Sequence, residues 1–314
     1  MRILITGASG LLGINLAVEL AQKHTVFGVV NQHRFDPGAV PFQVIQSDLL
    51  AQGAVEQALD ASQPDWVIHC AALANLDACE ADPIRAAQLN TELPGRLAEH
   101  VARGGARAGK ARLVHISTDS VFDGQRGEYT EEDIPNPLGV YSRTKLAGEQ
   151  AVAAADPAAV IARVNLFGWG ITGKRSLAEF FFINLSAGKS VLGFTDVTFC
   201  PILANDMAGV LENIFSKGLV GLYHLVGADC LTKYAFGVAL ARRFGLDDSL
   251  IQPATLEQSG LRAARSPNLS LSTQKLTLAL GEPLPGLSTG LERLYTLYQQ
   301  GYPQWLRSLV GQAV

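Results

Sequence analysis

The sequence predicts an α/β fold in which a doubly wound parallel sheet is followed by a smaller α/β domain. Short apolar segments alternate with segments of helical periodicity through the first half of the chain, which is typical of a parallel sheet with helices on both faces. A glycine-rich turn joins the first apolar segment to the first helical one. The alternation weakens in the second half, which indicates a domain of different construction.

Five segments of the first half have the length and composition of buried strands. They are short and mostly apolar, as expected for strands covered on both faces, and they span residues 2–6, 26–30, 42–46, 66–70 and 112–117. Apolar residues at helical spacing predict three helices between them, at residues 11–23, 54–61 and 85–103. Pro94 interrupts the last of these helices.

The second half has fewer regular segments. One strand is predicted at residues 221–226, and helices are predicted at residues 178–187, 205–216, 233–244 and 291–300. Proline and glycine punctuate residues 252–290, where the pattern is less regular.

The composition indicates a globular chain with a large core. Of 314 residues, 48% are hydrophobic and 17% charged, and 25 basic against 29 acidic residues give a net charge of -4. These values exclude a disordered chain and disfavour a nucleic-acid partner. No stretch of about 18 apolar residues lacks charges, so no membrane partner is expected. We expect a cytoplasmic protein, and a homodimer on base rate alone.

The four cysteines are Cys70, Cys79, Cys200 and Cys230. No two form a C-x-x-C pair, and no histidine neighbours them at metal-ligand spacing. The spacing therefore predicts neither a disulfide framework nor a zinc site, and no acidic cluster predicts another metal. We expect buried, reduced thiols, as in cytosolic proteins.

Residues 7–13, GASGLLG, form a G-x-x-G-x-x-G motif that follows a predicted strand and opens a predicted helix. Gly7 permits the tight turn, Gly10 lets the backbone approach a pyrophosphate, and Gly13 allows close packing of helix on sheet. The N–H groups at the start of the helix would face the phosphates. The candidate cofactor contacts in this loop are Gly7, Ser9, Gly10, Leu11, Leu12 and Gly13.

The motif identifies the first half as a dinucleotide-binding domain. We assign residues 1–167 to this domain, with residues 195–228 returning to it. Residues 168–194 and 229–314 are assigned to a substrate domain.

The residues after the second strand bear on the choice of cofactor. A fold that uses NAD usually places Asp or Glu about 20 residues beyond the glycine loop, where it binds the ribose 2′-hydroxyl. Here that window holds Asn31, Gln32, His33 and Arg34, with no carboxylate before Asp36. Arg34, together with His33, could neutralise a 2′-phosphate, so the sequence favours NADP(H) over NAD(H). The alternative is that Arg34 is a solvated loop residue.

Tyr141 and Lys145 lie four residues apart, which places them on one face of a helix, one turn from each other. A nearby ammonium is expected to lower the pKa of the tyrosine, which suits proton transfer to or from a carbonyl oxygen. Thr118, at the end of a predicted strand, could hydrogen-bond the same oxygen. The alternative for Thr118 is a turn cap.

The glycine loop, the strand-end hydroxyl and the Y-x-x-x-K pair together resemble the extended short-chain dehydrogenase/reductase superfamily, and within it the dTDP-4-dehydrorhamnose reductases. The resemblance covers nearly the whole chain. It is carried by HCAALANLDACEADPIRAAQLN (69–90), HISTDSVFDG (115–124), YTEEDIPNPLGVYSRTKLAGEQAV (129–152), GLYHLVGADCLTKYAFG (221–237) and ARSPNLSLSTQKL (264–276).

The resemblance implies roles for individual residues. Thr118 would be the catalytic hydroxyl, Tyr141 the proton donor, and Lys145 its activator and a ligand of the nicotinamide ribose. The other implied cofactor contacts are Asn31, Asp48, Leu49, Cys70, Ala71, Ala72 and Tyr141 itself, and Asn90 resembles a helix asparagine near the active site. The implied substrate contacts are Thr118, Ser120, Val121, Phe122, Tyr141 and Arg265. Arg265 would pair with a diphosphate, or would be a surface residue of a polar loop.

The reaction implied by the resemblance is the NADP(H)-dependent reduction of a nucleotide-linked 4-keto-6-deoxy sugar. The sequence departs from the family pattern at three places, all in segments that touch the sugar and the base. Ser120 stands where the family commonly has Tyr, no Trp occurs after Arg163 until Trp169, and residues 198–202 read TFCPI instead of a Gly-Ser-Pro-Thr pattern.

Two other functions remain open. One is a non-catalytic NADP-binding subunit of the same fold, because the regulatory subunit of methionine adenosyltransferase resembles this group. The other is a nucleotide-sugar epimerase, for which Cys200 and His224 are acid/base candidates by residue type, with a core position as the alternative for both. Dehydration is disfavoured, because Thr118 is followed by Asp119-Ser120 and not by a carboxylate pair.

Overall fold

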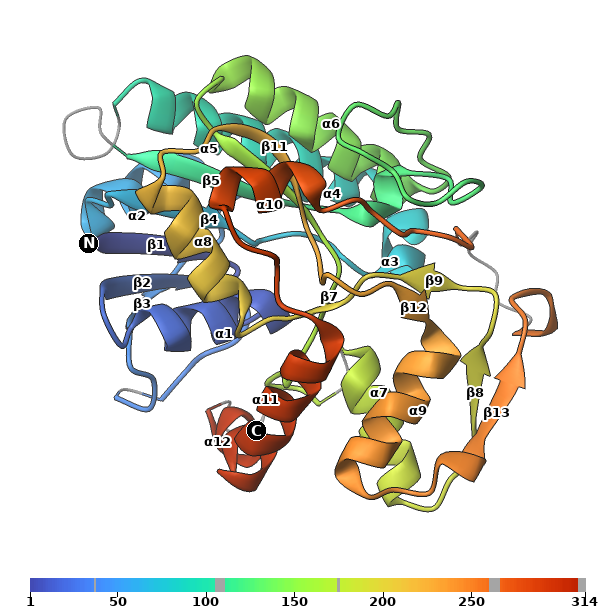
Figure 1. Ribbon diagram of the computed structural model, residues 1–314. Helices are drawn as coiled ribbons and strands as arrows, with labels where there is room; N and C mark the ends of the chain where they lie inside the picture. Colours follow the sequence, from blue (N-terminus) through green and yellow to red (C-terminus); the bar gives the residue numbers. More distant parts are fainter. Residues whose placement is uncertain (37, 105–110, 174–175, 260–265, 310–314) are drawn as a thin grey trace.

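The computed structural model of the chain describes residues 1–36, 38–104, 111–173, 176–259 and 266–309. Figure 1 shows a parallel sheet flanked by helices and, beyond the carboxyl ends of its strands, a smaller and mainly helical part.

The sheet is wholly parallel, which confirms the predicted fold class. Within the described residues it has seven strands, and its last edge strand comes from the second half of the chain. From edge to edge the strands are β11 (Gly221–Leu225), β6 (Val160–Val164), β5 (Arg112–Thr118), β4 (Trp66–His69), β1 (Arg2–Thr6), β2 (Thr25–Val30) and β3 (Gln43–Gln46).

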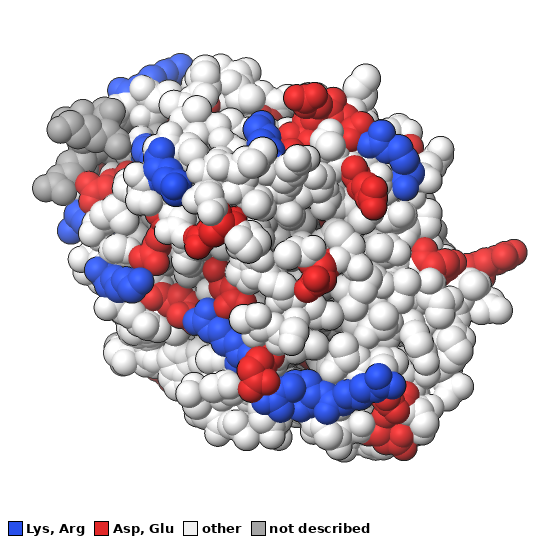
Figure 2. Space-filling view, in the orientation of Figure 1, with Lys and Arg blue, Asp and Glu red and all other residues white. Residues whose placement is uncertain are grey.

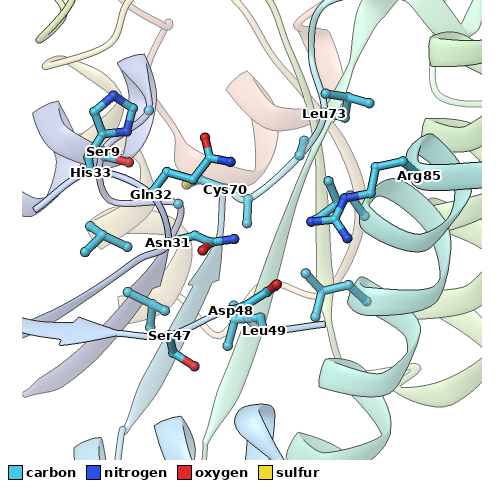
Figure 3. Close-up of a pocket in the computed structure, with 18 residues that line it drawn as sticks. Ser9, Asn31, Gln32, His33, Ser47, Asp48, Leu49, Cys70, Leu73 and Arg85 are labelled. Atoms are coloured by element: carbon cyan, nitrogen blue, oxygen red, sulfur yellow. The ribbon is translucent and has the colours of Figure 1, made fainter. Parts of the chain in front are cut away.

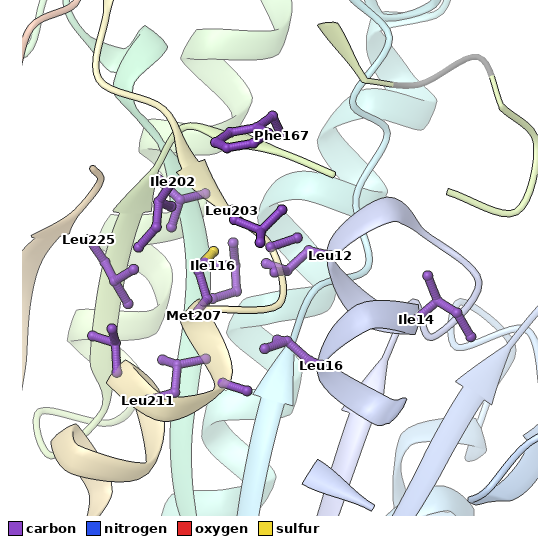
Figure 4. Packing of buried hydrophobic residues seen from close by; sticks show 14 of the residues in the cluster. Leu12, Ile14, Leu16, Ile116, Phe167, Ile202, Leu203, Met207, Leu211 and Leu225 are labelled. Atoms are coloured by element: carbon purple, nitrogen blue, oxygen red, sulfur yellow. The ribbon is translucent and has the colours of Figure 1, made fainter. Parts of the chain in front are cut away.

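Both faces of the sheet are apolar because successive residues of a strand point to opposite sides. In β1, Ile3 and Ile5 belong to one hydrophobic cluster and Leu4 to the other, and all three are buried. Figure 4 shows the first cluster, where Leu12, Leu16 and Met207 pack together. Helices contributing to the first cluster include α1 (Leu11–Leu20) and α8 (Met207–Ser216), and those contributing to the second include α2 (Ala54–Ser62), α5 (Leu93–Ala102) and α6 (Val140–Ala155).

The single helix predicted over residues 85–103 is instead a series of short segments. α4 (Pro83–Ala87) passes through a π-helical turn, η1 (Gln88–Glu92), into α5, and α3 (Leu76–Ala81) precedes them. Pro94 falls in the first turn of α5, where its missing N–H costs little. Asp82 caps α4 by accepting a hydrogen bond from the N–H of Arg85, 2.9 Å away.

The smaller part is built around aromatic side chains. Trp169, Phe182, Phe244 and Tyr298 contact one another with ring centroids 5.0–6.1 Å apart. Its elements are α7 (Leu177–Ser186), β8 (Val191–Phe194), α9 (Lys233–Phe244), β13 (Ile251–Ala254), α11 (Leu287–Gln299) and α12 (Tyr302–Ser308). The less regular stretch 252–290 also contains α10 (Gln274–Leu280), which contacts β11.

The prediction of four reduced thiols is wrong for two of them. Cys200 and Cys230 form a disulfide, with Cα atoms 4.1 Å apart, whereas Cys70 and Cys79 are free. Cys200 follows β9 (Thr198–Phe199) and Cys230 precedes β12 (Leu231–Thr232), and these two short strands pair antiparallel. Strand pairing between segments 30 residues apart brings the thiols together, which cysteine spacing alone does not reveal. A second two-stranded pair joins β7 (Leu166–Phe167) to β10 (Ile202–Leu203).

The surface carries charges of both signs. On the face shown in Figure 2, acidic and basic side chains are scattered among uncharged ones. Within the described ranges, no helix is long and apolar enough to cross a membrane. The same residues contain no cluster of three or more His, Cys, Asp or Glu side chains placed to hold a metal ion.

Candidate active site

The glycine loop connects β1 to α1 in the geometry that a dinucleotide requires. Gly7 has φ +67°, and a Cβ there would lie 2.8 Å from the backbone of Ala71. A Cβ on Gly13 would collide with the carbonyl of Gly7. Gly10 is the N-cap of α1, and no side chain caps the first turn of this helix. Its backbone N–H groups are therefore available to an anion such as a pyrophosphate.

A cavity of about 340 Å³ opens beside this loop (Figure 3). The predicted cofactor residues that line it are Gly7, Ser9, Gly10, Asn31, His33, Asp48, Leu49, Cys70, Ala71 and Ala72. The predicted residues that do not line it are Leu11, Leu12, Gly13, Arg34, Tyr141 and Lys145. Arg34 is exposed, in contrast to the half-buried His33.

Several lining residues were not singled out from the sequence. They are Val29, Val30, Gln32, Ser47, Leu73, Arg85, Leu89 and Leu93. Five of them lie at or shortly after the carboxyl ends of strands, where a parallel sheet forms a crevice, and a systematic search of those positions would have found them. Arg85, Leu89 and Leu93 come from the α4–η1–α5 segment, and local sequence gives no sign that this segment forms a wall.

Thr118 and Tyr141 meet at the carboxyl end of β5. Thr118 is the last residue of β5 and is buried, and Tyr141 lies half-buried in the first turn of α6. The hydroxyl of Thr118 lies close enough to that of Tyr141 to lower the pKa of the tyrosine, although burial outweighs this effect. Glu80 fixes the start of α6, because its carboxylate accepts a hydrogen bond from the N–H of Val140, 2.8 Å away. The structure thus brings together two of the three predicted catalytic side chains.

Lys145 lies one turn further along α6, and its ammonium points into the protein. Nζ donates to the carbonyl oxygen of Ile116, 2.6 Å away, and lies 3.5 Å from Nε2 of His115. Burial lowers the pKa of Lys145 to about 8, although Glu149 opposes this shift. Burial also raises the pKa of Tyr141 to about 12. The expected lowering of the tyrosine pKa by Lys145 is therefore wrong for this structure, because burial dominates and the ammonium is bound elsewhere.

Two stacked histidines lie beneath the ammonium. The rings of His69 and His115 are 5.4 Å apart, and both are fully buried. Burial lowers the pKa of His69 to about 3, and it lowers that of His115 well below its usual range, with Lys145 adding to both shifts. Both rings are therefore neutral at physiological pH, and the ammonium faces no second cation. Burial raises the pKa of Cys70 to about 12, so this lining residue is a neutral thiol.

Asp119 is a buried carboxylate beside Thr118 that was not selected as a site residue. Its Oδ1 accepts hydrogen bonds from the hydroxyls of Thr118, 3.1 Å away, and Ser120, 3.3 Å away. Asn165 donates to Oδ2 across 2.5 Å. Burial raises the pKa of Asp119, and these three hydrogen bonds oppose that shift. Its place directly after the strand-end hydroxyl was the available signal.

The predicted substrate residues fall into three groups. Ser120 is half-buried next to Thr118, whereas Val121 and Phe122 are fully buried. The ring of Phe122 stacks on Tyr129 at 4.1 Å, with the guanidinium of Arg163 5.0 Å from its centroid. Arg265 lies outside the described residues.

Asn90 joins the loop after β4 to α6. Its Oδ1 accepts from the N–H of Leu73 at 2.8 Å, and its Nδ2 donates to the hydroxyl of Thr144 at 3.1 Å. Asn90 is therefore a buried structural link between the cavity wall and the helix that carries Tyr141.

Neither acid/base candidate for epimerisation is suited to that role. Cys200 is in the disulfide and has no titratable thiol. His224 is buried in β11, where burial lowers its pKa to about 4. Core positions are therefore confirmed for both residues.

The fold and the site define an extended short-chain dehydrogenase/reductase with a nicotinamide dinucleotide as cofactor. The sheet is parallel and has a glycine loop at the end of one strand. Thr and Tyr side chains meet at the end of another strand, and a buried Lys lies one turn from the Tyr. The family model described as RmlD substrate binding domain matches residues 1–300, and the chain belongs to this family.

Named relatives are of two kinds. Methionine adenosyltransferase 2 subunit beta from Mus musculus is 34% identical over 302 residues, which cover 93% of this chain and 86% of that protein. A dTDP-4-dehydrorhamnose reductase from Mycobacterium tuberculosis is 32% identical over 290 residues, covering 90% and 88%. The crystal structure of a dTDP-4-dehydrorhamnose reductase from Bacillus anthracis in complex with NADP has a TM-score of 0.80 and 25% identity, covering 94% of this chain and 98% of that one.

Proposed function

We propose that the protein is an NADP(H)-dependent reductase of a nucleotide-linked 4-keto-6-deoxy sugar. The observation that carries this proposal is that the side chains of Thr118 and Tyr141 meet at the carboxyl end of β5, where Thr118 lowers the pKa of Tyr141 against the larger effect of burial. Family membership and the NADP bound by the Bacillus anthracis relative support it.

The glycine loop, the uncapped start of α1 and the cavity beside them fit a dinucleotide. Ser9 and Gly10 would hold its phosphates, and Asp48 and Leu49 its base. When bound, the cofactor supplies a hydride to the sugar carbonyl carbon.

Two residues of this chain then act on the carbonyl oxygen of the sugar. Thr118 orients that oxygen, and Tyr141 donates a proton to it. The raised pKa of Tyr141 keeps the proton on the phenol until the substrate arrives, as reduction requires. Lys145, one turn away, would hold the nicotinamide ribose, as the family resemblance implies.

The test is NADPH oxidation with a panel of dTDP-, UDP- and GDP-linked 4-keto sugars. We expect turnover with at least one of them, and a loss of at least ~100-fold in kcat for Tyr141→Phe, the lower end of what a general acid contributes. NADPH affinity should stay unchanged in that variant. Tyr298→Phe, which removes a hydroxyl in the distant aromatic cluster, is the matched control. Intact NADPH binding without turnover on any sugar would contradict the proposal.

A second candidate is a nucleotide-binding subunit of a larger enzyme, favoured by the 34% identity to Methionine adenosyltransferase 2 subunit beta. The retained Thr118, Tyr141 and Lys145 favour the reductase, because binding alone needs none of this chemistry. A stable complex with a methionine adenosyltransferase chain, together with no sugar reduction, would favour the subunit.

A further inference from the structure

Arg85 projects into the cofactor cavity from the wall opposite Asn31 and Gln32 (Figure 3). It is the only Lys or Arg among the described residues that line this cavity. Its side chain is half-buried, yet within the described chain no hydrogen bond or ion pair engages its guanidinium. Because no group of the described chain engages this guanidinium, it is available to a ligand group bound in the cavity.

The wall that carries Arg85 is apolar. Leu89 and Leu93 follow Arg85 at intervals of four residues and line the same cavity. Leu49 also lines the cavity, Leu73 lies on the side of Arg85, and Ser9 of the glycine loop lies on the opposite side (Figure 3). Phosphates bind well to the N–H groups of a helix start, and flat bases bind well between apolar side chains. The base of the dinucleotide is therefore expected at the end where Arg85 lies.

The charge at this end also favours a base over a phosphate. Asp48 lines the cavity near Leu49, and its carboxylate would repel a phosphate but can accept from an exocyclic amine. In the described structure, Asp48 and Arg85 do not form an ion pair with each other, although they line one cavity. A flat ligand group can therefore lie between the two charges.

We propose that the guanidinium of Arg85 stacks on the adenine ring of the bound dinucleotide. A planar cation suits the face of an aromatic ring, and arginine stacks better than lysine for this reason. Arg85 then contributes equally to NADP and NAD affinity and does not read the 2′-phosphate. The inference rests on the proposed cofactor, but not on the proposed sugar substrate.

The test is equilibrium binding of three ligands that share adenine and differ in phosphate. Dissociation constants of NADPH and NADH come from nicotinamide fluorescence, and that of adenosine from its competition with NADH. For Arg85→Ala we expect all three constants to rise by one common factor of about 3- to 30-fold, the range of a stacked cation. Arg85→Lys should recover only part of this loss. Arg242→Ala, which removes an exposed guanidinium on α9, should change none of the constants.

Three results would overturn the inference. A loss confined to NADPH would assign Arg85 to the 2′-phosphate, and a loss for both dinucleotides but not for adenosine would assign it to the pyrophosphate. Unchanged constants for all three ligands would also exclude the contact. Thermal unfolding of each variant separates these outcomes from misfolding. A protein that binds NADPH through Arg85 but reduces no sugar would contradict only the proposed reaction.

Discussion

Asn165 donates a hydrogen bond to Asp119, with Nδ2 2.5 Å from Oδ2. The other carboxylate oxygen of Asp119 accepts from Thr118. One buried carboxylate thus ties the strand-end hydroxyl to the segment that links β6 and β7. Asn165 is therefore a positioning residue for Thr118 through Asp119.

Replacing Asn165 should change the pH dependence of turnover. The hydrogen bond from Asn165 lowers the pKa of Asp119, so Asn165→Leu should raise that pKa further. Asp119 would then be protonated at a higher pH and would accept less well from Thr118. We expect the acid limb of the kcat–pH profile to move to higher pH, with kcat lower by about 10-fold, the factor that corresponds to roughly one hydrogen bond. An unmoved acid limb would refute this role, and Asn213→Leu, on the exposed side of α8, is the control.

Lys145 should make the free energy of unfolding depend on alkaline pH. Its pKa is about 8 in the folded chain and 10.5 ordinarily, so between these values the unfolded chain binds more protons and stability rises with pH. The variant Lys145→Met has no titratable group at this position, so its free energy of unfolding lacks this contribution. The free energy of unfolding of the wild type, minus that of the variant, should therefore rise by about 3 kcal/mol between pH 7 and pH 11. Urea unfolding of both proteins across this range measures it, and a constant difference would contradict it.

The disulfide between Cys200 and Cys230 leaves a definite number of thiols free to react. Denatured but unreduced protein should titrate two thiols, those of Cys70 and Cys79, and four after reduction. Cys200→Ser should lower the free energy of unfolding by about 3 kcal/mol, because closing a loop of this length restricts the unfolded chain. Four thiols before reduction would show that the bond does not form. Cys79→Ser, which leaves the disulfide intact, is the control for changing a buried cysteine.

Two helical glycines should respond in opposite ways to an added methyl group. Gly13→Ala puts Cβ against the carbonyl of Gly7, so it should displace the loop, lower stability and weaken NADPH binding. Gly209→Ala meets no atom within 4 Å in the described structure and should stabilise the chain by about 1 kcal/mol through helix propensity. Thermal unfolding with and without NADPH compares them. Equal effects would mean that the contact between Gly13 and Gly7 is not required.

Local sequence patterns predicted the bounds of an element correctly where all of its residues share one kind of environment. The strand Arg2–Thr6 and the helix Lys233–Phe244 have the predicted bounds, because continuous apolar runs and helical spacing reflect burial directly. Local patterns did not identify the strand Val160–Val164, although its residues are buried. It contains Arg163, whose charge is paired with Glu149 in the core at 2.8 Å, and sequence alone does not show that pairing.

The residues of the candidate site also divide into those that the sequence could locate and those that it could not. Gly7 was located from the glycine motif, and Asp48 and Cys70 were located from the family resemblance; all three line the cavity. Arg85 could not be located, because a π-helical turn and a proline determine how the α4–η1–α5 wall faces the cavity. The pKa of Tyr141 could not be predicted either, since it depends on burial and on where the Lys145 ammonium finds its acceptor.

The position of β11 at the edge of the sheet has a consequence for biosynthesis. β6 leaves the ribosome long before β11, its neighbour, which ends at Leu225. Until then the nascent chain carries an open strand edge, and such edges pair readily with other chains. Completion of the nucleotide-binding sheet must therefore wait for much of the second half to be translated, and premature termination before this strand should yield aggregating fragments.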